Sequence, residues 1–211
     1  MARSDLGESK RERILQAALQ LFSRQGYHAT TTKEIAAASG VAEGLIFYYF
    51  GGKRELLRHV VRRFSFLETV RGEADRLIGE EREEALVRFG RMYLAFLDHH
   101  KDYLLLIWSP ELLGDEEVTG EVRHLLAGMA EMGGRLIAAG GREAPPLDEQ
   151  TAQTAASMML SALLTHFIIG ERVKNRNPET DEAYIRSVVS IVLNGVRSGQ
   201  NGQDGRNGQD A

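Results

Sequence analysis

The chain has 211 residues, of which 43% are hydrophobic and 27% are charged, a composition typical of a globular protein with a substantial core. It contains no cysteine, which excludes disulfide bonds and thiolate chemistry. The net charge is -4, yet residues 1–64 hold 11 Lys and Arg against 6 Asp and Glu, whereas residues 65–211 hold 15 against 24. This uneven charge indicates an N-terminal segment that faces phosphate groups, although a chance distribution would also produce it.

The ends of the chain and its apolar stretches indicate where the protein resides. The N-terminus carries Arg3, Asp5 and Glu8 and lacks the apolar run of a secretory signal, so we expect a cytoplasmic protein. The longest apolar stretch, residues 158–169, is interrupted by polar side chains and is short for a membrane span. We therefore expect no membrane partner.

Apolar residues repeat at intervals of three and four along most of the chain, which predicts an all-α fold. A first helix ends at Gly26. Thr31 and Glu34 form a capping-box pattern that opens a short second helix, which stops at Gly40. Another short helix follows the turn, and a Gly-Gly pair ends it. Lys53 then begins a long fourth helix, which we expect to join this part of the chain to the second domain. The sequence thus predicts four helices near the N-terminus.

The same periodicity continues through the second part of the chain, where longer helices form a second core. We expect helices over residues 84–100, 103–113, 118–136, 148–172 and 178–197, giving about nine in all. Asp148 caps one of them, and Pro178 can open the last. The predicted organisation is a DNA-binding domain at 1–68, with its central motif at about 31–50, a ligand-binding and dimerisation domain at 69–197, and a disordered polar tail at 198–211.

Two short helices joined by a Gly-containing turn are the elements of a helix-turn-helix. Residues 11–57 closely resemble the TetR family of repressors, through the patterns ILQAALQLF, GYxATTT, IAxASGV and YFxxKxxL. The resemblance implies a homodimeric transcriptional regulator, and we expect a repressor that a small apolar or aromatic effector releases from a double-stranded, (pseudo)palindromic DNA operator. It implies no cofactor. The C-terminal region resembles no particular subfamily.

Candidate DNA contacts come from the residues themselves and from the resemblance. The three consecutive threonines place hydroxyls at a helix N-terminus, which suits a phosphate oxygen, although at least one is expected only to cap the helix. Glu43 could accept a hydrogen bond from a cytosine amine or could be a solvated carboxylate at the start of a helix. Carried over by position from the resemblance, residues 43–45, 47 and 48 of the recognition helix lie where bases or backbone are contacted, and Tyr49 and Lys53 lie at phosphate-contact positions. The expected DNA-binding residues are Thr30, Thr31, Thr32, Ala42, Glu43, Gly44, Leu45, Phe47, Tyr48, Tyr49 and Lys53.

Two further sets of residues are expected in the second domain. Aromatic, Met and His side chains suit an apolar ligand with a few polar groups, and most are equally typical of a core. The candidate pocket residues are Phe89, Met92, Tyr93, Phe96, His100, Tyr103, Trp108, Met129, Met158, Met159 and His166. Small and apolar residues on the last two helices favour a dimer interface over a monomer. The candidate interface residues are Ala155, Ala156, Ala162, Ile185, Val188, Val189, Val192 and Val196.

Two other classes of function were weighed against this interpretation. The chain has no phosphate-binding glycine loop, nucleophile elbow or metalloprotease motif, so we do not expect an enzyme. Its six histidines show no metal-ligand spacing, and we expect no metal. A DNA-binding regulator without any effector is the main alternative, and an all-helical enzyme is the remote one.

Overall fold

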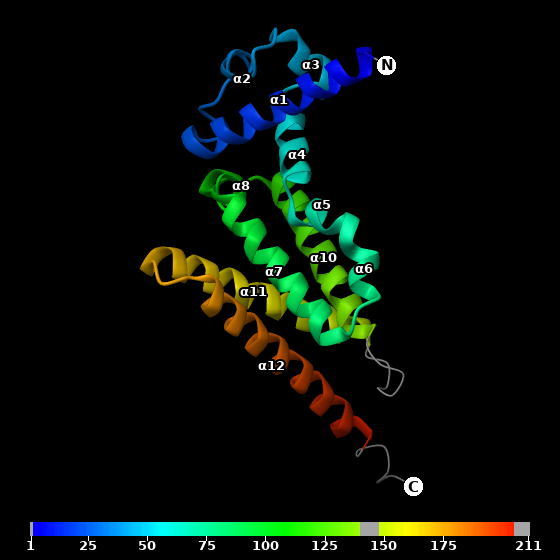
Figure 1. Cartoon of the computed structure of the whole chain (residues 1–211). Coiled ribbons are helices and arrows are strands. Elements are labelled where there is room, and N and C mark those ends of the chain that lie inside the picture. The colour runs from blue at the N-terminus through cyan, green and yellow to red at the C-terminus, as the bar shows by residue number, and fades with distance from the viewer. Residues whose placement is uncertain (1, 140–147, 205–211) are drawn as a thin grey trace. The chain divides into compact units, whose positions relative to one another are not determined.

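The computed structural model describes residues 2–139 and 148–204, and Figure 1 shows them as a chain of helices. Twelve α-helices and one 3-10 turn make up these residues, which include no strand, so the predicted all-α class is confirmed. The helices cluster into two compact units. Unit 1 combines residues 1–68 with 100–125, and unit 2 combines 69–99 with the chain from 126 onward.

Unit 1 is built from the N-terminal helices and a later segment that returns to them. Its helices are α1 (Ala2–Gln25), α2 (Thr32–Ser39), α3 (Gly44–Phe50), α4 (Lys53–Arg63), α8 (Lys101–Ile107) and α9 (Pro110–Leu113), with the first residues of α5 (Phe66–Val70) and of α10 (Glu116–Ala138). Helix α1 contacts α2, α4 and α8 and buries Ile14 and Leu15 completely. Each such side chain stabilises the fold by about 1.5–3 kcal/mol. The Tyr103 hydroxyl of α8 donates to the Val61 carbonyl of α4 at 2.9 Å, which joins the returning segment to the N-terminal helices.

The segment predicted as one helix over residues 103–113 is two helices in the structure, and that prediction was wrong. Ser109 separates α8 from α9 with an extended backbone (φ -67°, ψ 142°). It precedes Pro110, whose ring disfavours the helical conformation of the residue before it. Both helices and the start of α10 belong to unit 1, whereas the sequence suggested a second core for everything after residue 71.

Unit 2 packs three long helices against one another. It contains η1 (Arg71–Glu73), α6 (Ala74–Ile78), α7 (Arg82–His99), the rest of α10, α11 (Glu149–Val173) and α12 (Pro178–Asp204). Helices α7, α11 and α12 all contact one another and bury Phe89, Leu163 and Val189 completely. The predicted Asp148 cap is confirmed, because its carboxylate accepts from the Thr151 N–H at 2.9 Å.

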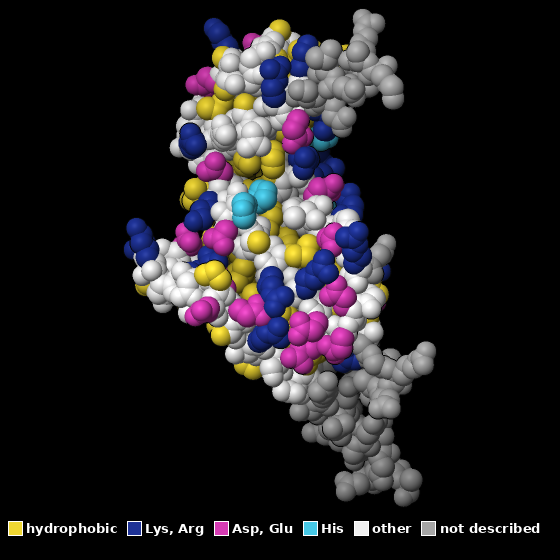
Figure 2. Space-filling model, viewed as in Figure 1, with side chains coloured by type: hydrophobic (Ala, Val, Ile, Leu, Met, Phe, Trp, Pro, Cys, Tyr) yellow, Lys and Arg dark blue, Asp and Glu magenta, His cyan; other side chains and the backbone are white. Residues whose placement is uncertain are grey.

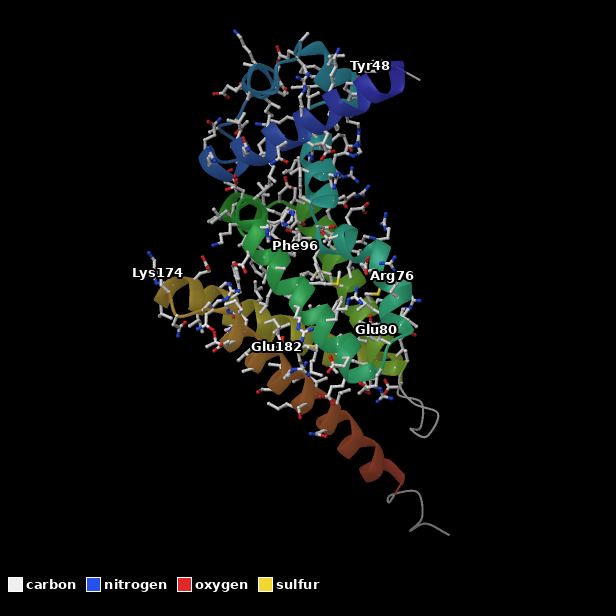
Figure 3. The ribbon with its side chains drawn as sticks, in the orientation of Figure 1. Tyr48, Arg76, Glu80, Phe96, Lys174 and Glu182 are labelled. Atoms are coloured by element: carbon white, nitrogen blue, oxygen red, sulfur yellow. The ribbon has the colours of Figure 1, made fainter. Side chains whose placement is uncertain are left out.

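Ion pairs cover the outer surface between α7 and α12. Glu182 of α12, labelled in Figure 3, accepts hydrogen bonds from Arg91 of α7, and Arg186 of α12 bonds Glu84 of α7 at 3.0 Å. Figure 2 shows basic and acidic side chains interspersed on this face. The Arg91 and Arg186 guanidinium groups lower the pKa of Glu182 to about 2, so its carboxylate stays ionised at neutral pH.

Helix α12 continues to Asp204, so residues 198–204 are helical where a disordered tail was predicted. No proline interrupts this stretch, and polarity alone therefore does not end the helix. Residues 205–211 of that predicted tail lie outside the described residues.

Helix α11 is also long and apolar enough to cross a membrane by length and composition, with 39% of its apolar window buried. A core helix passes the same test, and α11 packs against α7 and α12. Its buried residues pack inside unit 2, whereas Met158, Ile168 and Ile169 of the same helix are exposed.

Candidate nucleic-acid interface

Helices α2 and α3 form the helix-turn-helix of unit 1. The predicted capping box at the start of α2 is confirmed, because the Thr31 hydroxyl accepts from the Glu34 N–H at 3.2 Å and Glu34 accepts from the Thr31 N–H at 2.8 Å. Gly40 ends α2 in the left-handed conformation (φ 65°, ψ 40°), which costs an L-residue with a side chain about 1–2 kcal/mol. The Val41 N–H then donates to Ala36. These local bonds fix the angle at which the chain enters α3.

The other two threonines are engaged within unit 1. Thr30 is completely buried and donates its hydroxyl to the Gly26 carbonyl at 2.7 Å, so it closes the turn after α1. Thr32 donates its hydroxyl to the Glu43 carboxylate at 2.5 Å, which connects the start of α2 to the start of α3. Of the three predicted phosphate contacts, Thr31 and Thr32 lie toward solvent, and Thr30 does not.

Helix α3 has one buried and one exposed face. Ile46 and Phe50 are core residues, with at most 4% of their surface exposed. Tyr48 is 79% exposed and Phe47 is 52% exposed, and Figure 3 labels Tyr48 on α3. Large aromatic side chains exposed next to one another on a short helix are available to contact a partner. The predicted residues Ala42, Glu43 and Gly44 are exposed beside them, and Leu45 and Tyr49 are partly exposed.

Lys53 begins α4 and closes the loop between α1 and α2. Its ammonium donates to the carbonyls of Tyr27 at 2.9 Å, His28 at 3.3 Å and Thr30 at 2.8 Å. It also lies 4.5 Å from the centre of the Tyr27 ring, a cation–π contact. An ammonium has three donors, so a phosphate contact by Lys53 requires one of these bonds to be released.

Two acidic residues of the segment 100–125, Glu111 and Glu121, form hydrogen bonds to the N-terminal part of unit 1. The sequence did not reveal this role. Glu121 of α10 is almost buried, and its carboxylate accepts from Arg58 of α4 at 3.1 Å and 3.2 Å and from Arg62 at 2.6 Å and 2.8 Å. Glu111 of α9 accepts from the His28 N–H at 3.2 Å. The bonds from Arg62 and Arg58 lower the pKa of Glu121. Sequence spacing alone could not pair residues about sixty positions apart.

The candidate pocket residues divide between the two units. Phe89, Tyr93 and Phe96 of α7, Met129 of α10 and Met159 of α11 are buried in unit 2, and Met92 is partly exposed there. Burial raises the pKa of Tyr93 to about 12, so its phenol is neutral. His100, Tyr103 and Trp108 belong to unit 1, where Trp108 is 51% exposed.

Met158 and His166, both predicted pocket residues, lie on α11 in different surroundings. Met158 is 64% exposed. His166 stacks on Tyr184 of α12 with ring centres 4.1 Å apart and bonds Asp181 at 2.8 Å. Arg176 bonds the same Asp181 at 2.7 Å, so His166 is part of a polar network between α11 and α12. Among the described residues, no group of three or more His, Asp or Glu could hold a metal ion.

The candidate dimer residues are mostly inside unit 2. Ala155, Ala156, Ile185 and Val189 have at most 8% of their surface exposed, because they pack within their own protomer. Ala162, Val188 and Val192 are partly exposed, and the side chain of Val196 lies outside the described residues. The exposed face beside them is a different set: Ser157, Met158, Ser161, Thr165, Ile168 and Ile169 of α11 and Ala183, Ser187 and Ile191 of α12.

Comparisons with known proteins agree with this geometry. Residues 14–60 match the family model described as bacterial regulatory proteins, tetR family. The uncharacterized HTH-type transcriptional regulator YvkB of Bacillus subtilis (strain 168) is 30% identical over 174 residues, which cover 77% of this chain and 85% of that protein. The HTH-type transcriptional regulator HbdR of Aromatoleum sp. (strain CIB) is 34% identical over 125 residues, 56% of this chain and 54% of that protein.

Solved structures share the fold over most of the chain. FadR from Bacillus subtilis, solved in complex with stearoyl-CoA, has a TM-score of 0.66 and 20% identity and covers 88% of this chain and 98% of its own. The fatty acid degradation regulator FadR from Bacillus halodurans has a TM-score of 0.64 and 23% identity and covers 89% of this chain and 96% of its own. These similar proteins are regulators and not enzymes. The helix-turn-helix geometry, the matched family model and the relative YvkB together establish that the chain is a DNA-binding transcriptional regulator of the TetR family.

Proposed function

We propose that this protein is a homodimeric repressor that binds a (pseudo)palindromic operator through α2 and α3 and is released by a small, mostly apolar ligand. The observation that carries the proposal is the exposed aromatic face of α3, where Tyr48 and Phe47 project from a helix whose opposite face is core. A recognition helix reads base edges in the major groove, and aromatic side chains can contact thymine methyl groups there. Such a regulator acts in the cytoplasm.

The proposed dimer surface is the exposed face of α11 and α12. Between Gln150 and Gly170, α11 carries no Asp, Glu, Lys or Arg, and residues 187–196 of α12 also lack them. The apolar residues of this surface include Ile191 of α12, which is 70% exposed, and Met158 of α11, which is 64% exposed. A charge-free helix-pair surface with small residues suits packing against the same pair of a second copy, which gives a four-helix bundle.

The proposed ligand region is the interior of unit 2, where the aromatic and Met side chains of Phe89, Tyr93, Met129 and Met159 are buried. The neutral phenol of Tyr93 supplies a polar group in apolar surroundings. Stearoyl-CoA is the ligand in the similar B. subtilis FadR structure, and its acyl chain is apolar, so long acyl chains, free or joined to CoA, are the first ligands to test here.

Helix α10 is the proposed route from ligand to DNA. Its residues 116–125 belong to unit 1, where Glu121 bonds Arg58 and Arg62 of α4, and its remaining residues, including Met129, belong to unit 2. Helix α4, which was expected to join the two domains, ends at Arg63 and lies entirely within unit 1. A ligand that prefers the non-binding arrangement by about 3 kcal/mol lowers DNA affinity on the order of 100-fold.

The test begins with an operator duplex selected by the protein from a random pool. Binding of the labelled duplex is followed by fluorescence anisotropy while stearoyl-CoA, free stearate or CoA alone is added. We expect stearoyl-CoA or free stearate to weaken operator binding on the order of 100-fold, and CoA alone to leave it unchanged. Steady operator binding across a wider panel of apolar ligands would favour the alternative, a regulator without a small-molecule effector.

A further inference from the structure

Glu43 gives the recognition surface an unusual electrostatic character. It is the single charged residue between Glu34 and Lys53, a stretch that includes most of α2, the turn and all of α3. It is exposed and directly precedes α3, next to the exposed side chains of Phe47 and Tyr48. A helix that approaches polyanionic DNA therefore presents one anion and no cation.

The carboxylate of Glu43 is held in place by the neighbouring helix. Oε1 accepts the Thr32 hydroxyl at 2.5 Å, a short charge-assisted hydrogen bond. The same carboxylate makes no capping bond to the N–H groups of α3. Glu43 thus keeps a fixed negative charge at the start of α3, on the exposed side of the motif.

We propose that Glu43 determines specificity by a penalty, weakening binding to every DNA sequence that lacks a base amine opposite its carboxylate. A carboxylate can only accept hydrogen bonds, and in the major groove only the amines of cytosine and adenine donate them. Guanine N7 and O6 and thymine O4 are acceptors and repel it. On unmatched DNA the Glu43 carboxylate lies near phosphates and has no base amine to bind. The resulting repulsion weakens binding to those sequences and so discriminates against them. The inference rests on α3 as the groove-reading helix of the proposed function.

The test compares two duplexes of equal length, one of random sequence and one selected by the wild-type protein from a random pool. Glu43→Gln removes the charge and keeps the size of the side chain. It is expected to tighten binding to the random duplex on the order of 3- to 10-fold, because a like charge near the phosphates is gone. Binding to the selected duplex stays equal or weakens, so the ratio of the two affinities falls by at least about 3-fold. Glu43→Ala is expected to change the ratio in the same direction.

One control variant separates the local charge at Glu43 from the net charge of the protein. Glu131→Gln makes the same change of net charge at an exposed position of α10, in unit 2, and is expected to leave both affinities unchanged. Thermal unfolding checks that each variant is folded.

The inference is overturned if Glu43→Gln leaves the affinity ratio unchanged, whether both affinities stay constant or shift together. It is also overturned if Glu43→Gln lowers the ratio only by weakening binding to the selected duplex, since the carboxylate would then impose no penalty on unmatched DNA. Tyr48→Ala tests the docking separately. If that variant binds both duplexes like wild type, α3 does not read the groove, and the proposed function fails before the role of Glu43 is reached.

Discussion

Among single residues, Lys53 stabilises the loop between α1 and α2 and so positions the helix-turn-helix. It was expected at a phosphate contact, and in the structure its ammonium binds three carbonyls of the loop that follows α1. Those carbonyls precede α2, so Lys53 fixes the start of the helix-turn-helix. A hydrogen bond to a charged group contributes more than a neutral one, about 1.5–3 kcal/mol net.

We predict that Lys53→Met lowers the free energy of unfolding by about 1–3 kcal/mol, because the Tyr27 and Thr30 carbonyls lose their donor. Lys53→Arg, which keeps charged donors, is expected to lose less. Urea denaturation followed by circular dichroism measures both. A Lys53→Met variant as stable as wild type would show that the loop does not depend on this ammonium.

Glu121 makes the stability of unit 1 depend on pH. The bonds from Arg62 and Arg58 hold its pKa below the ordinary value of 4.5, so the native state binds a proton less readily than the unfolded chain. Its contribution is complete above about pH 4.5 and is lost as the pH falls through the lowered pKa. Stability therefore rises with pH across this acidic range.

We predict that Glu121→Gln costs about 1–2 kcal/mol at pH 7, at the low end for a buried carboxylate because both arginines reach solvent. The variant should also lose less stability than wild type when the pH is lowered from 5 to 3, since it has no carboxylate to protonate. Urea unfolding at a series of pH values measures the difference. Parallel stability curves for the two proteins would contradict this role of Glu121.

At the scale of elements, α10 and α11 approach closely through glycine. A Cβ built on Gly133 of α10 would lie 2.7 Å from the Ala156 Cβ of α11 and 3.5 Å from the Phe89 ring of α7. The methyl of Ala156 cannot move aside as a flexible side chain would. By contrast, nothing lies within 4 Å of a Cβ built on Gly120, earlier in the same helix.

These two glycines make a matched pair for mutation. We predict that Gly133→Ala destabilises the protein by about 1–3 kcal/mol through overpacking, whereas Gly120→Ala stabilises it by up to about 1 kcal/mol through helix propensity. Thermal and urea unfolding measure the change in stability, and therefore its sign, for each variant. Equal effects of the two substitutions would mean that α10 and α11 do not pack through Gly133.

The elements also show which features the sequence could predict. The Thr31 capping box, the Gly40 turn and the Asp148 cap depend on neighbouring residues, so local patterns identified them. The partner of each helix was not predictable, because an apolar stripe says which face is buried and not what covers it. Thus α8 packs on α1, and Val189 is buried in its own protomer where a dimer contact was expected.

At the scale of the whole molecule, the proposed dimer depends on a surface that the fold leaves exposed. Ile191 lies on it and Val189 lies beneath it, two residues apart on α12. We predict that Ile191→Glu yields a folded monomer, because burying an unpaired charge in the interface costs several kcal/mol. Val189→Glu should instead unfold unit 2. Ala127→Glu, at an exposed position of α10, serves as the control for added charge.

Light scattering at micromolar concentration, with circular dichroism to confirm folding, distinguishes these variants. A folded Ile191→Glu variant that remains dimeric would place the interface elsewhere on the molecule. A folded, monomeric Val189→Glu variant would mean that Val189 contacts the second subunit after all.

In the proposed function, two copies of the helix-turn-helix bind one operator. Hydroxyl-radical footprinting of the protein on its selected duplex, combined with the mass of the complex, detects this arrangement. We expect two chains per duplex, or a multiple of two, and protected patches about 34–36 Å apart on one face of the DNA. One chain on a single protected half-site, or protection without any preferred position, would show that the protein does not bind as such a dimer.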